Sequence, residues 1–354
     1  MTIEDSQSQS IKKRWSSRRK DIKPKAITAS QQDLIKFGSM NPGQTLPLVV
    51  EPNYRHVDLI AWVKNNAELL EAKLLEHGGL LFRGFGLSTQ AHFEQFLQAL
   101  SVPLMHYMEG ATPRTELSDR IYTSTEFPPD RTISIHNELC YVVTWPMKIF
   151  FYCVKPADRG GETPIGDVRK ILQRIAPEIR NRFKEKNWML LRNFGNGFGL
   201  PWQSSYHVSD KAALEEYFHG ARISYEWRDV DRLRTRQVRP AIANHPKTGE
   251  PVWFNHIGFW HVSSLGADLR ERFVEEFTEQ GLPFNTYYGD GAPIEDSVID
   301  ELRRAYDAET VAYPWQSGDL LMLDNMLVAH GRNPFAGTRR VLTAMGEPFT
   351  RGES

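Results

Sequence analysis

Apolar segments with strand-like spacing occur in two widely separated parts of this chain, and that separation constrains the fold more than any other feature. The first part holds residues 133–136, where isoleucines alternate with polar residues, and the apolar run 148–155. The second holds three short runs, at 320–323, 327–330 and 340–345. Short apolar or alternating runs predict strands, and strands from distant parts of a chain are typical of a double-stranded β-helix, or jelly roll. We therefore predict an α+β protein with a jelly-roll core, flanking helices and a long insertion.

Apolar residues at helical spacing occur both before and after the first group of strands. Residues 57–75 predict a helix that stops at Gly78, with a strand over 80–85 and a second helix, capped by Ser88, running to Leu100. Residues 168–183 predict a helix that Pro177 breaks or kinks.

The long insertion spans residues 195–310 and mixes glycines and aromatic residues with two expected helices, near 267–279 and 294–307. Because it lies between the two groups of strands, we expect it to form a lid or a wall of the substrate pocket.

The first forty residues differ from the rest because they are basic and contain few apolar side chains. Their positive charges are Lys12, Lys13, Arg14, Arg18, Arg19, Lys20, Lys23 and Lys25. Such a segment cannot bury enough surface to fold alone. We expect a flexible tail over 1–40 and a single domain over 41–354; the alternative for the tail is docking to an acidic partner such as a carrier protein.

The composition of the whole chain excludes several classes of protein. Among 354 residues, 43 are Lys or Arg and 44 are Asp or Glu, so the net charge of -1 gives no reason to expect nucleic acid or a membrane surface as partner. No apolar run is long enough to span a bilayer, and the N-terminus lacks the pattern of a signal peptide. The two cysteines, Cys140 and Cys153, do not amount to a disulfide framework and are expected to be buried, inert thiols. We expect a cytoplasmic protein.

His136 and Glu138 are the most informative polar pair in the sequence. Side chains two residues apart on a strand lie on the same face, so an imidazole and a carboxylate would point toward one place. A second histidine completes the 2-His-1-carboxylate facial triad that binds Fe(II) and leaves coordination positions open. His330, which follows an apolar strand and the polar corner Asp324–Asn325, is the expected third ligand. The alternative for any one of these histidines is a structural role in the core.

Four blocks of sequence occur in an order that resembles a known family. They are His136–Glu138, Gly160–Pro164, Trp315–Asp319 with Asp324–Asn325, and His330 with Arg339–Arg340. Over roughly residues 80–349 the chain thereby resembles the taurine-catabolism dioxygenase (TauD/TfdA) family. The resemblance implies an Fe(II)- and 2-oxoglutarate-dependent enzyme that uses O2. Residues 151–153 and 253–255 are similar to a narrower group, that of the amino-acid hydroxylase of syringomycin biosynthesis.

The resemblance also implies roles for individual residues. His136, Glu138 and His330 would bind the iron, and Thr163 would lie near the 2-oxoglutarate carboxylate. One arginine of the pair Arg339–Arg340 would bind the far carboxylate, because the planar guanidinium fork matches it with two hydrogen bonds. Neighbours on a strand point to opposite faces, and we predict that Arg340 faces inward while Arg339 is a surface charge.

Further residues bear on the substrate. The taurine enzyme of this family grips its sulfonate with an arginine four residues after the cofactor arginine; Ala344 stands in that position here, which argues against a sulfonate. Glu138 argues against halogenation, because halogenating relatives have a small residue in place of the carboxylate. Arg114 is a candidate contact for an anionic group of the substrate. Three histidines of the insertion either line the pocket or have packing roles: His245, His256 and His261.

The function implied is hydroxylation of an unactivated C–H bond in a small molecule. The substrate would be an amino acid or peptide-like intermediate of secondary metabolism, such as antibiotic biosynthesis, either free or tethered to a carrier protein. Desaturation or cyclisation at the same iron centre is the alternative within the enzyme class. A non-catalytic jelly-roll binding protein is the alternative outside it.

Overall fold

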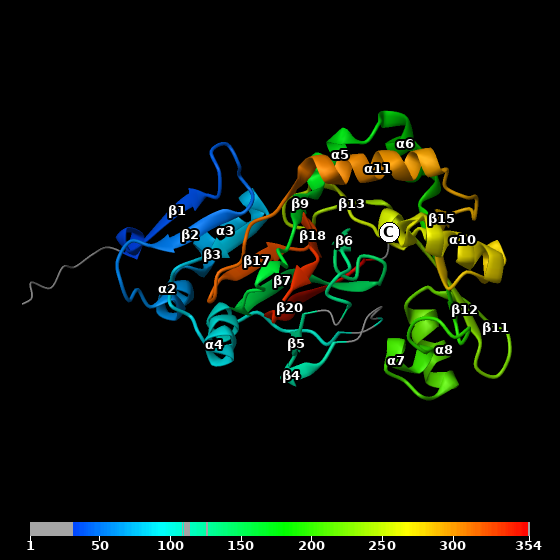
Figure 1. The fold of residues 1–354 in the computed structure, drawn as a ribbon, viewed down its shortest axis with the longest axis horizontal. Helices are drawn as coiled ribbons and strands as arrows, with labels where there is room; N and C mark the ends of the chain where they lie inside the picture. The colour runs from blue at the N-terminus through cyan, green and yellow to red at the C-terminus, as the bar shows by residue number, and fades with distance from the viewer. Residues whose placement is uncertain (1–30, 108, 110–113, 125–126, 353–354) are drawn as a thin grey trace, which may run out of the picture. The chain divides into compact units, whose positions relative to one another are not determined.

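The computed structural model describes residues 31–107, 109, 114–124 and 127–352, and its core is built from two sheets that face each other (Figure 1). The larger sheet has the strand order β1-β2-β3-β17-β7-β20-β5-β4. Its strands are β1 (Ile35–Ser39), β2 (Leu48–Pro52), β3 (Gly79–Phe82), β17 (Leu320–Asp324), β7 (Thr144–Lys155), β20 (Arg340–Thr350), β5 (Ile121–Thr123) and β4 (Glu116–Ser118). The smaller sheet has the order β16-β9-β18-β6, with β16 (Thr310–Val311), β9 (Ile165–Asp167), β18 (Val328–Arg332) and β6 (Ile133–His136). Each sheet combines strands from both parts of the sequence, as predicted for a jelly roll.

The long strand β7 shows why the larger sheet is covered on both faces. Ile149, Phe151 and Cys153 belong to the main buried core. Phe150 and Tyr152 point the other way, because successive side chains on a strand alternate between faces. They pack on helix α4 (Gln90–Leu100), where Tyr152 stacks on Phe93 with ring centroids 5.4 Å apart.

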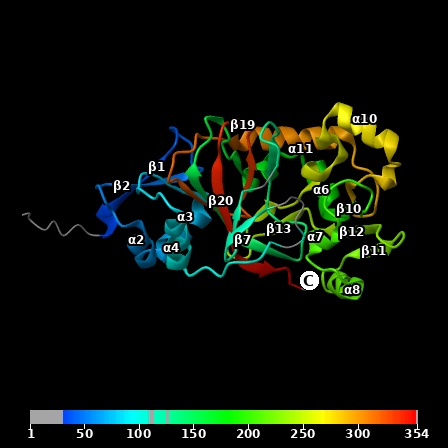
Figure 2. The same cartoon turned by 60° about the horizontal axis from the view of Figure 1, so that its bottom comes forward.

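The remaining helices surround this core. They are α2 (Leu59–Asn65), α3 (Ala67–His77), α5 (Val168–Arg174), α6 (Pro177–Lys186), α7 (Trp202–Tyr206), α8 (Lys211–Gly220), α9 (Ile257–Trp260), α10 (Ala267–Glu276) and α11 (Asp296–Glu309). Short 3-10 turns occur at Gln31–Leu34, Val262–Leu265 and Glu279–Gly281. Helices α2 and α4 lie at one end of the core, whereas α8 and α10 lie at the other end in both views (Figures 1 and 2).

The insertion contains a sheet of its own with the order β11-β12-β10-β15. Its strands are β10 (Trp188–Phe194), β11 (Ser224–Trp227), β12 (Leu233–Arg239) and β15 (Phe284–Tyr288), and a hairpin of β13 (Ile242–Asn244) and β14 (Pro251–Trp253) follows β12. The insertion sheet therefore begins at β10, before the predicted limit of 195. Helix α11 returns to the core and packs along α5 and β9 (Figure 1).

Several predicted boundaries move for local physical reasons. The expected helix over 57–75 is two helices, with Asn66 ending α2 and preceding α3. The cap of α4 is Thr89 rather than Ser88, since the Thr89 hydroxyl accepts a hydrogen bond from the His92 amide. Pro177 starts a new helix, α6, at its first position, where its missing N–H is not needed.

The start of the ordered chain also differs from the prediction. Strand β1 falls inside the expected tail of 1–40 and pairs antiparallel with β2. The basic residues of that tail lie outside the described part of the chain. Within the described residues, no helix has the length and apolar character needed to cross a membrane.

Candidate iron site

The two predicted histidine ligands lie directly opposite each other on neighbouring strands of the smaller sheet. His330 on β18 pairs in register with His136 on β6, and their ring centroids are 4.8 Å apart. The His136 Nδ1 lies 2.8 Å from the Ser134 carbonyl oxygen. A carbonyl only accepts, so Nδ1 carries the proton and Nε2 keeps a free lone pair. The Phe151 ring of the facing sheet lies 5.0 Å from the His330 ring, which places the site between the two sheets.

Glu138 joins the histidines, although the reason predicted for it is wrong. Strand β6 ends at His136, and Glu138 stands in the turn that follows. Asn325 sets its position: the Asn325 Oδ1 accepts from the Glu138 amide at 2.8 Å, and the Asn325 Nδ2 donates to the Glu138 carbonyl at 2.8 Å. Ligand atoms of His136, Glu138 and His330 lie within 4.8 Å of one another. The acid therefore converges on the histidines through a side chain that lies far away in sequence.

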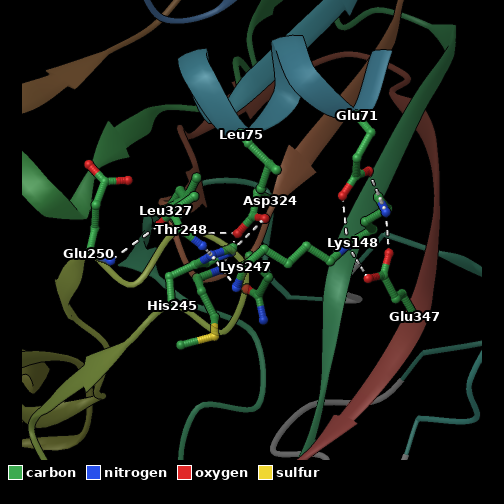
Figure 3. Close-up of polar contacts among 12 residues, drawn as sticks. Glu71, Leu75, Lys148, His245, Lys247, Thr248, Glu250, Asp324, Leu327 and Glu347 are labelled. Carbon is green, nitrogen blue, oxygen red and sulfur yellow. Dashed lines mark hydrogen bonds and ion pairs between the residues drawn. The ribbon is translucent and has the colours of Figure 1, made fainter. Parts of the chain in front are cut away.

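Asn325 is itself held by a rigid connection between β17 and β18. The buried Asp324 Oδ1 accepts from the amides of Met326 and Leu327, at 2.9 and 3.0 Å. Its Oδ2 lies 3.1 Å from the His245 Nε2 (Figure 3). Because the His245 Nδ1 accepts from the Thr248 amide, Nε2 carries the proton and donates to Asp324. Asp324–Asn325 forms the polar corner predicted from the sequence, but the sequence did not show that Asn325 positions the metal ligand Glu138.

Burial and charge give the three side chains the protonation states that a cation needs. Burial lowers the pKa of His136 and lowers that of His330 well below the ordinary value, so both imidazoles are neutral near pH 7. Burial by itself would raise the pKa of Glu138, but the Arg114 guanidinium, the largest opposing influence, helps to hold it below its ordinary value. Two neutral imidazoles and one carboxylate form the donor set of a facial-triad Fe(II) site.

Arg114 contacts this donor set directly. Its Nη2 lies 2.6 Å from the Glu138 Oε2, both side chains are buried, and the guanidinium lies over the Tyr107 ring at 4.5 Å. Arg114 was a candidate contact for an anionic group of the substrate, but in the structure its partner is the carboxylate of the predicted metal ligand Glu138. A charge-assisted hydrogen bond of this kind orients a metal ligand.

His256 lies beside the site without being able to serve as a further ligand. Its ring centroid is 5.3 Å from that of His136. The His256 Nε2 lies 2.7 Å from the Asn137 carbonyl oxygen, and its Nδ1 accepts from the Trp260 indole at 2.9 Å. Both nitrogens are therefore occupied, and burial lowers the pKa of His256 to about 3. His256 lines the site, whereas His245 and His261 have structural partners, Asp324 and Ser263.

Comparison with known proteins agrees with this geometry. The family model described as taurine catabolism dioxygenase TauD, TfdA family matches residues 44–345. The chain belongs to the TauD/TfdA family. As a member it is an Fe(II)- and 2-oxoglutarate-dependent oxygenase, and the convergent His136, Glu138 and His330 fit the iron that this family uses.

Relatives of this TauD/TfdA enzyme include proteins of secondary metabolism. The dapdiamide synthesis protein DdaC of Enterobacter agglomerans is 36% identical over 301 residues, covering 83% of this chain and 92% of DdaC. A clavaminate synthase-like protein of Arabidopsis thaliana is 31% identical, covering 80% of this chain and 86% of the relative. Among solved structures, PvcB of Pseudomonas aeruginosa shares the fold with a TM-score of 0.51 at 17% identity, over 90% of this chain and 93% of PvcB.

The arginine pair of the TauD/TfdA enzyme is oriented opposite to the prediction. Arg340 is exposed, whereas the Arg339 Nε donates to the Gly161 carbonyl at 2.9 Å and its Nη1 donates to the Ser124 hydroxyl at 3.1 Å. The register of β20 against β7 shifts between Arg340 and Val341, and Val341 faces the core. Arg339, two residues earlier, is thereby turned inward. The prediction of an inward Arg340 is wrong because it took the second arginine of the pair from the family pattern, whereas Arg339 shares the inward face with Val341.

Because Arg339 rather than Arg340 faces inward, the residue four positions beyond the inward arginine also changes. It is Thr343 rather than Ala344. Thr343 pairs with Phe151, is fully buried, and its hydroxyl has no hydrogen-bond partner among the described residues. Neither Thr343 nor Ala344 carries a positive charge, so the argument against a sulfonate substrate is unchanged.

Thr163, the other residue predicted to bind 2-oxoglutarate, is buried. Its Oγ1 accepts a hydrogen bond from the Trp315 indole at 3.2 Å, and it lies two residues after Gly161, the partner of Arg339.

The two cysteines are free and buried; burial raises the pKa of Cys153 to about 12 and raises that of Cys140 well above its ordinary value. Neither thiol is reactive near neutral pH.

Proposed function

We propose that this enzyme hydroxylates an unactivated C–H bond of an amino acid or peptide-like intermediate in secondary metabolism. The observation that carries the proposal is the convergence of His136, Glu138 and His330 between two sheets. The names of the relatives support the pathway class: DdaC belongs to dapdiamide synthesis, and a 25% identical relative from Fischerella ambigua is an isocyanoethenyl-indole synthase. The reduced state of both buried cysteines agrees with action in the cytoplasm.

The residues of the chain have distinct tasks in this proposal. His136, Glu138 and His330 would hold Fe(II), which together with 2-oxoglutarate and O2 supplies the oxidising power for inserting oxygen into a C–H bond. Arg339 and Thr163 would hold the co-substrate. Burial lowers the pKa of Arg339 to about 10, with Arg332 adding to the effect, and the hydrogen-bond acceptors found for Arg339 are neutral. A bound dicarboxylate would give this guanidinium the counter-charge that it lacks.

The walls of the site would exclude water from the reacting atoms. Phe151 packs against His330, and Phe259 of α9 lies 4.7 Å from the His136 ring. The insertion thus contributes one wall and the larger sheet the other. An apolar enclosure of this kind strengthens the electrostatic interactions inside it.

The test is the stoichiometry of the reaction. Substrate, 2-oxoglutarate and O2 should give hydroxylated substrate, succinate and CO2. We expect Fe(II)-dependent succinate release by the wild type and none by His136→Ala, because two remaining ligands cannot retain the metal. A product 16 mass units heavier indicates hydroxylation, in line with the balanced reaction, and a loss of two hydrogens would show desaturation or cyclisation instead. A wild type without Fe(II)-dependent succinate release would support the non-catalytic binding protein.

The form of the substrate is a separate part of the proposal. A free intermediate and one tethered to a carrier protein differ in what the enzyme must recognise. Turnover of a carrier-loaded amino acid by the full chain, compared with a variant lacking residues 1–30, which keeps strand β1, would show whether the basic tail recruits the carrier. Equal turnover by both would remove that role.

A further inference from the structure

Arg192, in the insertion, is a buried cation with no direct ion pair among the described residues. It lies on β10, and only 6% of the residue is exposed. Its Nη2 donates to the Ser205 hydroxyl at 3.1 Å, while its Nη1 is buried with no hydrogen-bond partner among the described residues. None of the ion pairs found among those residues includes Arg192. A buried guanidinium left in this state destabilises a protein unless something else meets it.

The surroundings of Arg192 connect it to the iron site. Its guanidinium stacks on the Phe194 ring at 4.6 Å and on the Trp260 ring at 5.4 Å. Trp260 donates its indole proton to His256, and the His256 ring lies 5.3 Å from the ring of His136. Two aromatic residues, Trp260 and His256, thus separate the guanidinium from a metal ligand.

The nearby acid, Glu109, is a buried charge close to Arg192 but forms no direct ion pair with it. The charges of Glu109 and Arg192 influence each other, but both carboxyl oxygens of Glu109 have other partners. The Tyr217 hydroxyl donates to one oxygen and the Gln237 Nε2 donates to the other, the latter at 2.8 Å. Gln237 pairs with Leu190, two residues from Arg192, so both project from the same face of the insertion sheet. The Gln237 Oε1 also lacks a partner among the described residues.

We propose that Arg192 binds a carboxylate of the substrate. The free Nη1 supplies a charged donor, the Trp260 indole gives a flat surface beside it, and the body of the bound molecule extends past His256 toward the metal ligands. This inference deepens the proposed function by naming a substrate class, namely acids. It favours a free acid, or one with a side-chain carboxylate, because an amino acid tethered as a thioester has lost its α-carboxylate.

The first test needs no substrate. A buried cation whose partner is a bound substrate should contribute little to the stability of the substrate-free protein. Arg192→Met should therefore leave the midpoint of thermal unfolding of the metal-free protein unchanged or raise it. The matched comparison is Arg239→Met. Arg239 is also buried, projects from the same face of this sheet, and donates to the carbonyls of Tyr141 and Ala221 at 2.9 and 2.8 Å. Its loss should lower the midpoint clearly, and an equal fall in Arg192→Met would overturn the proposal.

The second test measures recognition of the acid. The full chain is loaded with Zn(II) in place of Fe(II) and with saturating 2-oxoglutarate, so that the co-substrate site is filled. The twenty proteinogenic L-amino acids and their primary amides are then compared by calorimetry and thermal shift. We expect acids, and not their amides, to bind, and Arg192→Gln to weaken binding about thirtyfold or more. Arg236→Gln, on the opposite face of the sheet, is the control that should bind as the wild type does.

Three results of the second test would each overturn the inference: no acid binds, amides bind as well as acids, or Arg192→Gln binds as tightly as the wild type. Wild-type succinate release is measured in parallel with Fe(II). Succinate release without selective acid binding would reject the role of Arg192 and leave the oxygenase function intact. Selective acid binding without succinate release would support the role of Arg192 and reject the oxygenase function.

Discussion

At the scale of single residues, two of the three ligands of the candidate iron site are oriented by polar neighbours, whereas the buried His330 Nδ1 has no hydrogen-bond partner among the described residues. Ser134 accepts from His136, and Asn325 and Arg114 hold Glu138. Neighbours of this kind account for much of the affinity of a metal site. The same scale decides between the two adjacent arginines, of which only Arg339 is turned toward the interior.

The arginine pair gives the first prediction at this scale. Arg339→Gln should raise the KM for 2-oxoglutarate about thirtyfold or more, because a buried charged donor to a carboxylate is lost. Arg340→Gln should leave that KM unchanged, since Arg340 is exposed. Succinate release at varied 2-oxoglutarate concentrations measures both. A larger effect at Arg340 than at Arg339 would instead support the inward Arg340 expected from the resemblance to the family.

At the scale of elements, polar clusters fasten the connections that carry ligands. Lys148 of β7 lies between Glu71 of α3 and Glu347 of β20, and Lys247, in the β13–β14 hairpin, contacts both acids (Figure 3). His245 of the same hairpin holds Asp324, at the end of β17. The hairpin of the insertion is thereby tied to the connection that positions Glu138.

The β17–β18 connection can be tested at Asp324. Asp324→Ala would leave the amides of Met326 and Leu327 and the His245 Nε2 without their acceptor. We expect it to lower the free energy of unfolding by about 3–5 kcal/mol. Because Asn325 would lose its fixed position, the affinity for Co(II) should also fall about 10–100-fold.

The matched control for this connection is Asp324→Asn. It keeps an oxygen acceptor for the two amides, and it should lose less in both measurements. Urea unfolding and Co(II) titration provide the two values. Wild-type Co(II) affinity in Asp324→Ala would contradict the role of the connection in positioning Glu138.

At the scale of the whole molecule, the insertion and the core form one enclosure around the ligands. Helix α9 brings His256 and Phe259 against His136, and α11 packs on α5 and β9. This enclosure buries several histidines in their neutral form. Burial lowers the pKa of His256 to about 3 and that of His261 to about 4. The unfolded chain takes up protons near pH 6.5, whereas the folded protein does not, so stability should fall as the pH falls below that value.

His261 provides the test of this acid sensitivity, because it lies away from the metal ligands. Between pH 6.5 and about 4, each such histidine lowers the free energy of unfolding by up to about 1.4 kcal/mol per pH unit. In the metal-free protein, His261→Gln should reduce the slope of the free energy of unfolding against pH by the contribution of about one proton. Urea unfolding at several pH values measures the slope, and the difference between variant and wild type at pH 8 isolates the packing loss. An unchanged slope would contradict the neutral, buried state of His261.

Residue types and spacing determined much of this protein from the sequence alone. Two groups of apolar strands predict the two mixed sheets, and a His-x-Glu pair with a distant histidine predicts the donor set, because these are properties of short segments. Tertiary contacts decided the rest. Glu138 lies beyond its strand and is positioned by Asn325, and Arg339 rather than Arg340 turns inward. The insertion also leaves the Arg192 Nη1 buried with no hydrogen-bond partner among the described residues. Each depends on groups distant in sequence, whose separation in space is set only when the sheets and the insertion pack together.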